Sequence, residues 1–246
     1  MSDFRKYNFG RRIPQYIIGL ICMAVGLVLL KRTYWGISPI SAVPDAVANI
    51  TPLTLGNTTI FLHIICVIAQ IIIVKRVTVK AILTAFVGIP FGYLVDLVMF
   101  LINPVSLSVP MKLVFLVVGI AIQGFGVLTI VCSDLMLPAP DELNHAISDT
   151  FGIPLGKVKV FADAIYVIIA IIINLAAALA GGGTGFLNDI RESGILTAIG
   201  GLLTAKYLAS VGIATFASVF LTGRFITWFG KAFPKLKMDP FWNNKK

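Results

Sequence analysis

A small set of polar side chains interrupts the long apolar stretches of this sequence. A charge in such a stretch is costly unless it is paired or hydrated, so these residues usually face an interior site. Lys206 lies near the centre of its stretch, with Asp163 and Asp96 as candidate partners. The full set is His63, Gln70, Asp96, Gln123, Asp163, Asn174 and Lys206.

These residue types favour two kinds of chemistry. A Lys206–Asp163 or Lys206–Asp96 pair could hold a polar solute, or an aspartate could gain and lose a proton while a solute moves. The alternative is a buried ion pair that only fixes helix packing. We expect substrate-binding roles for Lys206, Asp163 and Asp96, and both interpretations stay open at this stage.

Several other chemistries lack their sequence signals. The chain has no phosphate-binding loop, no dinucleotide fingerprint and no hydrolase elbow, so we expect no enzyme and no cofactor. No close His/Cys spacing predicts a metal site. Three separated cysteines, Cys22, Cys66 and Cys132, are expected to be small buried hydrophobes.

The composition indicates the class of protein. The 246 residues are 58% hydrophobic and only 13% charged, with a mean hydropathy of +0.95. The apolar residues fall in blocks of about 20, which is the length that crosses a bilayer. The net charge is +9, and the basic residues lie at the ends of the apolar blocks. They do not form the basic face with interleaved aromatic residues that nucleic-acid binding needs. We therefore predict an all-α, polytopic membrane protein whose partners are lipid and a small molecule, not nucleic acid.

The blocks predict about six spans in two repeats of three helices, followed by a tail. The first repeat covers 1–104, with spans at about 13–30, 59–74 and 79–102. The second covers 105–230, with spans at about 113–132, 158–180 and 195–221. The last span is unusually long and could be tilted, kinked or broken at Gly212. Residues 231–246 form a basic cytoplasmic tail.

The distribution of Lys and Arg predicts the orientation. With six spans and an inside N-terminus, the inner segments carry most of the basic residues, which places both termini in the cytoplasm. We expect a multi-pass protein of a cytoplasmic membrane. The small-residue pattern Gly88-x-x-x-Gly92 permits close helix packing, within the monomer ahead of a homodimer.

An internal repeat is visible at a shift of 100 residues. This shift aligns Gly19 with Gly119, Gly26 with Gly126, and Leu55-Gly56 with Leu155-Gly156. A shift of 113 aligns Leu83-Thr84-Ala85 with Leu196-Thr197-Ala198. Three spans per repeat force the halves to enter the membrane from opposite sides. This inverted repeat is common in transporters, whose sites lie near the midplane between the halves.

A Pro-rich segment follows the first helix of each half, and each reads as a breaker and then a short helix start. Ser38 can cap with Pro39 in the first turn, while Pro140 precedes Asp141 and Glu142. Either the two segments re-enter from opposite faces and line a cavity, or they lie on the two membrane surfaces. The acidic pair has a simple role at a helix start, but in a re-entrant segment it could attract a cation, an amine or protons.

The repeat also pairs polar positions, as a two-sided central site would require. His63 is equivalent to Asp163, and Asp45 is equivalent to His145. A histidine in an apolar helix is often only hydrogen-bonded to a neighbouring carbonyl, so that alternative remains. The candidate substrate-binding residues are Lys206, Asp141, Asp163, Asp96, His63, His145, Ser38, Asp45 and Glu142.

The same segments resemble the YczE/YyaS/YitT family of bacterial membrane proteins. The run from Gly36 through Ser38-Pro39 to Pro44 is similar to the family's loop after its first helix. Ser133-Asp134-Leu135, Asp141 and Leu143 fall where the family has Ser-Asp-Leu-Gly-x-Gly-Pro-Trp-Asp-x-Leu. Met136, Pro138, Ala139 and Pro140 replace that motif's glycines, proline and tryptophan. The resemblance implies a membrane protein of a presumed transport group, with no named substrate.

We therefore expect a secondary transporter or facilitator of a small organic solute, with its site between the two halves. One alternative is a solute-binding subunit that needs a separate energising complex. Another is an accessory membrane protein that transports nothing.

Overall fold

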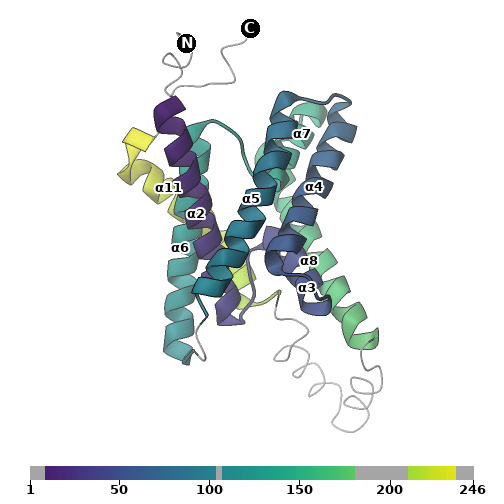
Figure 1. The fold of residues 1–246 in the computed structure, drawn as a ribbon, viewed down its shortest axis with the longest axis vertical. Helices are drawn as coiled ribbons and strands as arrows, with labels where there is room; N and C mark the ends of the chain where they lie inside the picture. Colours follow the sequence, from purple (N-terminus) through teal and green to yellow (C-terminus); the bar gives the residue numbers. More distant parts are fainter. Residues whose placement is uncertain (1–8, 104–106, 181–209, 237–246) are drawn as a thin grey trace.

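The computed structural model describes residues 9–103, 107–180 and 210–236, and this part of the chain is all-helical. Six helices are long and apolar enough to cross a membrane, which makes the chain a multi-pass integral membrane protein (Figure 1). They are α2 (Phe9–Thr33), α4 (Leu55–Val74), α5 (Val79–Leu101), α6 (Val109–Ser133), α8 (Leu155–Ala180) and α11 (Ile213–Ala232). The first five contain or closely match the predicted spans.

The two Pro-rich segments form short helices, α3 (Pro39–Ile50) and α7 (Ala139–Phe151). Each begins as predicted, with Ser38 at the N-cap of α3 and Pro140 in the first turn of α7. The first turns are buried between the long helices, and Pro39 and Pro44 of α3 are among the buried residues. This burial favours the re-entrant alternative over two helices lying on the membrane surface.

The predicted shift of 100 residues reappears in backbone detail. The residues that follow α2 and α6, Tyr34 and Asp134, both adopt the left-handed conformation, with φ of 58° and 50°. The residues before them also match, because Thr33 and Ser133 each donate a side-chain hydrogen bond of 2.7 Å to the carbonyl three residues back. Equivalent segments of the two halves therefore fold alike.

Helices α2 and α6 pack against each other through glycines that are equivalent under the repeat. A methyl group on Gly19 would lie 3.0 Å from the Gly126 carbonyl oxygen, and one on Gly26 would lie 2.7 Å from the Gly119 carbonyl oxygen. Each glycine therefore meets the equivalent of the other. Such reciprocal contacts are typical of a two-fold axis, and they support the predicted inverted repeat.

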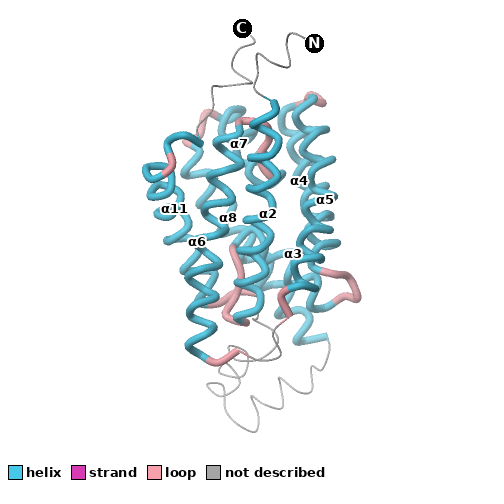
Figure 2. Tube along the Cα trace, turned by 60° about the vertical axis from the view of Figure 1, so that its left-hand side comes forward, coloured by secondary structure: helices cyan, strands magenta, loops and turns pink. Residues whose placement is uncertain are grey.

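The short helices also exchange partners. Helix α3 packs on α8 of the second half, while α7 packs on α4 of the first half. Between them, Cys66 of α4 lies 3.6 Å from the hydroxyl of Tyr166 in α8, its own equivalent position. Figure 2 shows these helices as one bundle. The two halves are thus interleaved instead of lying side by side.

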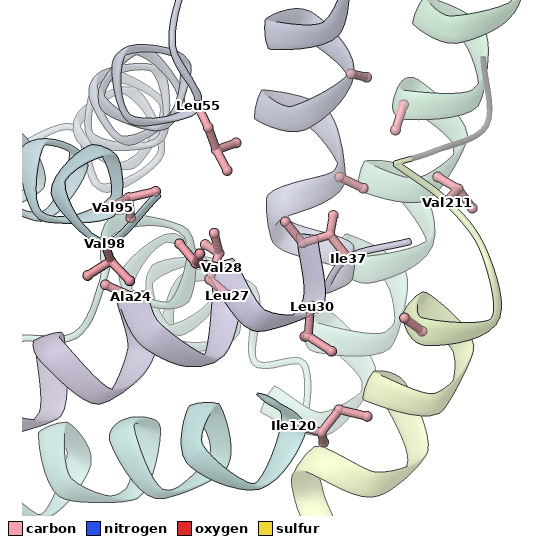
Figure 3. Close-up of a cluster of buried hydrophobic side chains, with 14 of the residues drawn as sticks. Ala24, Leu27, Val28, Leu30, Ile37, Leu55, Val95, Val98, Ile120 and Val211 are labelled. Atoms are coloured by element: carbon pink, nitrogen blue, oxygen red, sulfur yellow. The ribbon is translucent and has the colours of Figure 1, made fainter. Parts of the chain in front are cut away.

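The loop that leads into α3 is held by the segment before α11. The Ile37 amide donates to the Ser210 carbonyl at 3.3 Å, and the Ala214 amide donates to the Trp35 carbonyl at 2.8 Å. Ile37 and Val211 join Leu30 and Ile120 in the main buried cluster (Figure 3). Non-helical backbone is tolerated at membrane depth only where protein or water satisfies it, and these bonds do so here.

The predicted sixth span, 195–221, is wrong in its bounds. The described helix starts at Ile213, because Gly212 is extended with φ −165° and ψ −159° and acts as the N-cap. The break falls at the glycine that the sequence singled out, and the helix then continues to Ala232. Residues 195–209 lie outside the described part of the chain, as does the partner of Leu83-Thr84-Ala85 at a shift of 113.

Both ends of the described chain lie at the same end of the bundle. The Gln15 amide in α2 donates to the Leu236 carbonyl at 2.9 Å, and Arg12 donates to the Ser133 carbonyl at 2.7 Å. The loop between α4 and α5 lies at this end too (Figure 1). We call it the terminus end.

The glycine contact between α2 and α6 generates a stability prediction. In Gly26→Ala, the methyl group would lie 2.6 Å from the backbone nitrogen of Gln123, and such overpacking costs about 1–3 kcal/mol. We expect a lower melting temperature in detergent. Gly10→Ala on the same helix is the matched control, because a methyl there meets nothing within 4 Å. Equal melting of the two variants would contradict a tight α2–α6 crossing.

Candidate functional site

A cavity of about 310 Å³ lies between the N-terminal ends of α3 and α7. Its walls come from α2, α4, α6, α8 and α11, with Phe91 contributed by α5. Helix α4 packs on α5, and α8 and α11 both contribute residues to the cavity wall. We call it the central cavity. Its volume is that of about ten water molecules at ~30 Å³ each, so it suits a small solute.

The repeat equivalence extends to the cavity wall. Positions that differ by 100 residues line it together, one from each half. The pairs are Met23 and Gln123, Leu27 and Val127, Ser38 and Pro138, Ile40 and Pro140, Ser41 and Asp141, Thr59 and Lys159, and His63 and Asp163. The cavity therefore lies where the two halves meet, and several polar side chains of one half face a different residue type in the other.

A hydrogen-bonded chain surrounds the start of α3. Gln123 of α6 donates from Nε2 to the Ser38 hydroxyl at 3.3 Å, and Ser38 donates to the Ser41 hydroxyl at 3.0 Å. Ser38, one of the predicted site residues, lines the central cavity, although its side chain does not cap the helix. The side-chain oxygen of Gln123, Oε1, is buried and has no hydrogen-bond partner within the described residues.

His63 lines the cavity from α4, as predicted. Its ring stacks on Phe91 of α5, with centroids 5.7 Å apart and planes within 7°. The ring is buried, and its Nδ1 has no hydrogen-bond partner among the described residues. The expected bond to a neighbouring carbonyl is thus missing at this nitrogen. Together the two rings form a flat wall of the cavity.

The charged residues of the cavity lie on α7 and α8. Asp141 and Lys159 form an ion pair of 3.1 Å, and Asp163 lies one turn beyond Lys159 on the same helix. All three line the central cavity. Asp141 and Asp163 were predicted site residues, and the structure brings them together with His63 and Ser38.

Other predicted site residues lie elsewhere. Asp96 serves the start of α4, where it accepts from the Thr54 hydroxyl at 2.6 Å and from the Gly56 amide at 2.8 Å. Asp45 is fully buried beside Lys31, in an ion pair of 2.5 Å. Neither lines the central cavity. These two carboxylates hold helix ends together.

Glu142 and His145 line a different cavity at the terminus end. This cavity of about 850 Å³ lies between the ends of α4 and α6 and one side of α7. Glu142 forms an ion pair of 2.8 Å with Lys80 and accepts from the Leu137 amide at 3.0 Å, which supports the start of α7. A cavity of about 160 Å³ shares Leu137 and His145 with this one, and Asp141 and Lys159 with the central cavity.

Lys206 lies outside the described residues, so its pairing with Asp163 or Asp96 stays a prediction. The residues that the site analysis of the sequence missed are Gln123, Lys159, Thr59 and Ser218. Gln123 stood out as an amide in an apolar stretch, and its equivalence to Met23 gave no hint of function. Lys159 falls at the start of the predicted fifth span, 158–180, and its pairing with Asp141 on another helix has no sequence signal.

The described residues contain no group of three or more His, Cys, Asp or Glu side chains that could hold a metal ion. The central cavity offers groups that can bind a solute: an ion pair, a second carboxylate, hydroxyls, an amide and an aromatic wall. The cavity is suited to hold a small solute that is partly polar and partly apolar.

The role of Asp96 generates a prediction that separates it from the site. Asp96→Ala leaves the Thr54 hydroxyl and the Gly56 amide without their acceptor, so we expect a loss of about 1–3 kcal/mol in stability. The check is thermal melting in detergent, with Asp149→Ala on the exposed end of α7 as control. Asp96 would instead belong to the site if its alanine variant melted normally and lost a solute response.

Comparison with known proteins gives a family without a function. No curated protein and no solved structure matches the chain. Residues 10–200 match one family model, described as a family of unknown function (DUF6198). The match covers more than half of the chain, and this protein belongs to the DUF6198 family.

Proposed function

We propose that the protein is a secondary transporter or facilitator of a small organic solute, which binds in the central cavity. The observation that carries this proposal is the position of the cavity. It lies between the starts of two short helices and is lined by equivalent residues of both halves. In inverted-repeat transporters, solute sites lie at the repeat interface and are formed by interrupted helices.

The two halves could act as alternate gates. Three cavities that share lining residues form a route from the terminus end to the solute site. The 160 Å³ cavity lies between the 850 Å³ cavity and the central cavity. The Asp141–Lys159 ion pair lies between the 160 Å³ cavity and the central cavity. Rocking of one half against the other about the α2–α6 crossing would close this route and open one past α3, as in alternating access.

The charge distribution supports a cytoplasmic terminus end. Arg11, Lys75, Arg76 and Lys157 lie at helix ends or loops there, against Lys31, Arg32 and Lys112 at the opposite end. Basic residues collect on the cytoplasmic side of membrane proteins. Within this proposal the protein resides in a bacterial cytoplasmic membrane, and the YczE/YyaS/YitT resemblance stays a prediction.

Reconstitution tests the proposal without knowledge of the solute. Purified protein in liposomes is incubated with a defined mixture of small metabolites, and the lumenal contents are measured by mass spectrometry. We expect at least one metabolite to accumulate or exchange above protein-free liposomes. Binding without any flux would instead indicate a subunit that needs a separate energising complex.

A cavity-filling variant adds a matched test. Gly223 of α11 lines the central cavity, and a Cβ atom there meets nothing within 4 Å, so Gly223→Trp adds bulk at the cavity wall without a clash at Cβ. We expect loss of flux with little change in melting temperature. Gly230→Trp on the same helix lies outside the cavity lining and should keep the flux. Unchanged flux in Gly223→Trp would place the solute route elsewhere.

A further inference from the structure

Two hydroxyl groups of the central cavity, on Thr59 and Ser218, can act as acceptors for a bound solute. Thr59 donates its proton to the Leu55 carbonyl at 2.7 Å, and Ser218 donates its proton to the Ala214 carbonyl at 2.7 Å. A hydroxyl has one proton and two lone pairs. With the proton committed to the backbone, each of these oxygens offers only lone pairs to the cavity.

Gln123 adds an acceptor that the described protein leaves unused. The side chain is 7% exposed and lines the cavity, and its Nε2 is committed to Ser38. Ser38 in turn donates to the Ser41 hydroxyl at 3.0 Å, so the Ser38 oxygen is the acceptor for the Gln123 side-chain amide. The Gln123 Oε1 atom has no partner among the described residues. A buried polar atom of this kind calls for a donor.

The described lining of the cavity has one carboxylate more than it has cationic side chains. Asp141 is paired with Lys159 at 3.1 Å, while Asp163 accepts no hydrogen bond from the described residues and has Lys159 as its neighbouring cation. Two carboxylates and one ammonium give the lining a formal charge of −1. A bound cation would balance this charge, so a cation is favoured over a neutral solute.

The rest of the wall is apolar. Phe91 and His63 form the flat wall, and Leu27, Leu62 and Ile226 complete it. An aromatic face next to acceptors attracts a cation and packs against an apolar body. The cavity therefore combines a cationic end with an apolar pocket of about 310 Å³.

From these contacts we propose that the central cavity selects solutes that carry a protonated amine. The ammonium of the solute lies between the Asp163 carboxylate and the side-chain Oε1 of Gln123, and the apolar part of the solute lies against Phe91. This inference rests on the proposed function for the location of the site. The start of α3, whose first turn holds no acidic residue, offers a place for a carboxylate. The recognised group is the ammonium, which simple amines and amino acids have in common.

Matched probes test the amine requirement. Benzylamine, benzyl alcohol and benzoate share one ring and differ in charge, and phenylglycine is benzylamine with an added carboxylate. Their binding to the detergent-purified full chain is measured by thermal shift and calorimetry. We expect binding of benzylamine or phenylglycine, and none of the other two. Tighter binding of phenylglycine would assign the α3 start to the carboxylate, and tighter binding of benzylamine would identify a simple amine site.

Two substitutions test the assigned atoms. Asp163→Asn should weaken amine binding by about ten-fold or more, the equivalent of one charge-assisted hydrogen bond. Asp149→Asn, outside this cavity, should leave it unchanged. Gln123→Glu should strengthen amine binding, which a merely unfolded variant cannot do. Binding of benzyl alcohol or benzoate as tight as that of the amines, or unchanged affinities in both cavity variants, would overturn the proposal.

The test also separates this inference from transport itself. Amine binding without flux in liposomes would retain the inference and contradict the transporter. Flux of a solute without an amine, together with no amine binding, would retain the transporter and contradict the inference.

Discussion

The close crossing of α2 and α6 is the contact on which the rest of the arrangement depends. Gly19 meets Gly126 and Gly26 meets Gly119, and a Cβ atom added to any of the four would lie 2.7–3.2 Å from the carbonyl oxygen of the facing glycine. In lipid, where apolar surface gives little drive for helix association, such small residues let backbones approach and gain packing energy. Because the contact is reciprocal under the repeat, it places the first helix of each half back to back. The short helices that follow must then start on opposite sides of it.

From that crossing the site follows by geometry. The chain turns back after each first helix, at Tyr34 and at Asp134, and runs inward to the start of α3 or α7. Each short helix packs on a helix of the other half. The interrupted backbone is held by protein, as in the bonds from Ile37 and Ala214. The space left between the two helix starts is the central cavity, where equivalent positions carry unlike side chains: Ser41 against Asp141, and Thr59 against Lys159.

Sequence reasoning could predict the first five spans and the two short helices, because hydropathy blocks and Pro-rich breakers are local signals. The inverted repeat stays a prediction, which the glycine contacts between α2 and α6 support. Four residues that the sequence proposed for the site, Asp141, Asp163, His63 and Ser38, line the central cavity. Sequence reasoning failed where a role depends on a neighbouring helix. Asp96 serves the start of α4, which only the passage of α5 beside Gly56 reveals. Lys159 joins the site through its ion pair with Asp141 of α7, which hydropathy does not reveal. A break at Gly212 was one of the alternatives that the sequence left open for the sixth span, and the described helix starts directly after it.

The central claim is that the two halves cross the membrane in opposite senses, and labelling of equivalent positions tests it most directly. Leu53 and Ile153 differ by 100 residues, are both exposed, and lie in the loops after α3 and α7. Each is replaced by cysteine in a chain without Cys22, Cys66 and Cys132, and a membrane-impermeant thiol reagent is applied to intact cells and to inverted vesicles. The account predicts that Leu53→Cys reacts from one side only and Ile153→Cys only from the other. Reaction of both from the same side would contradict it.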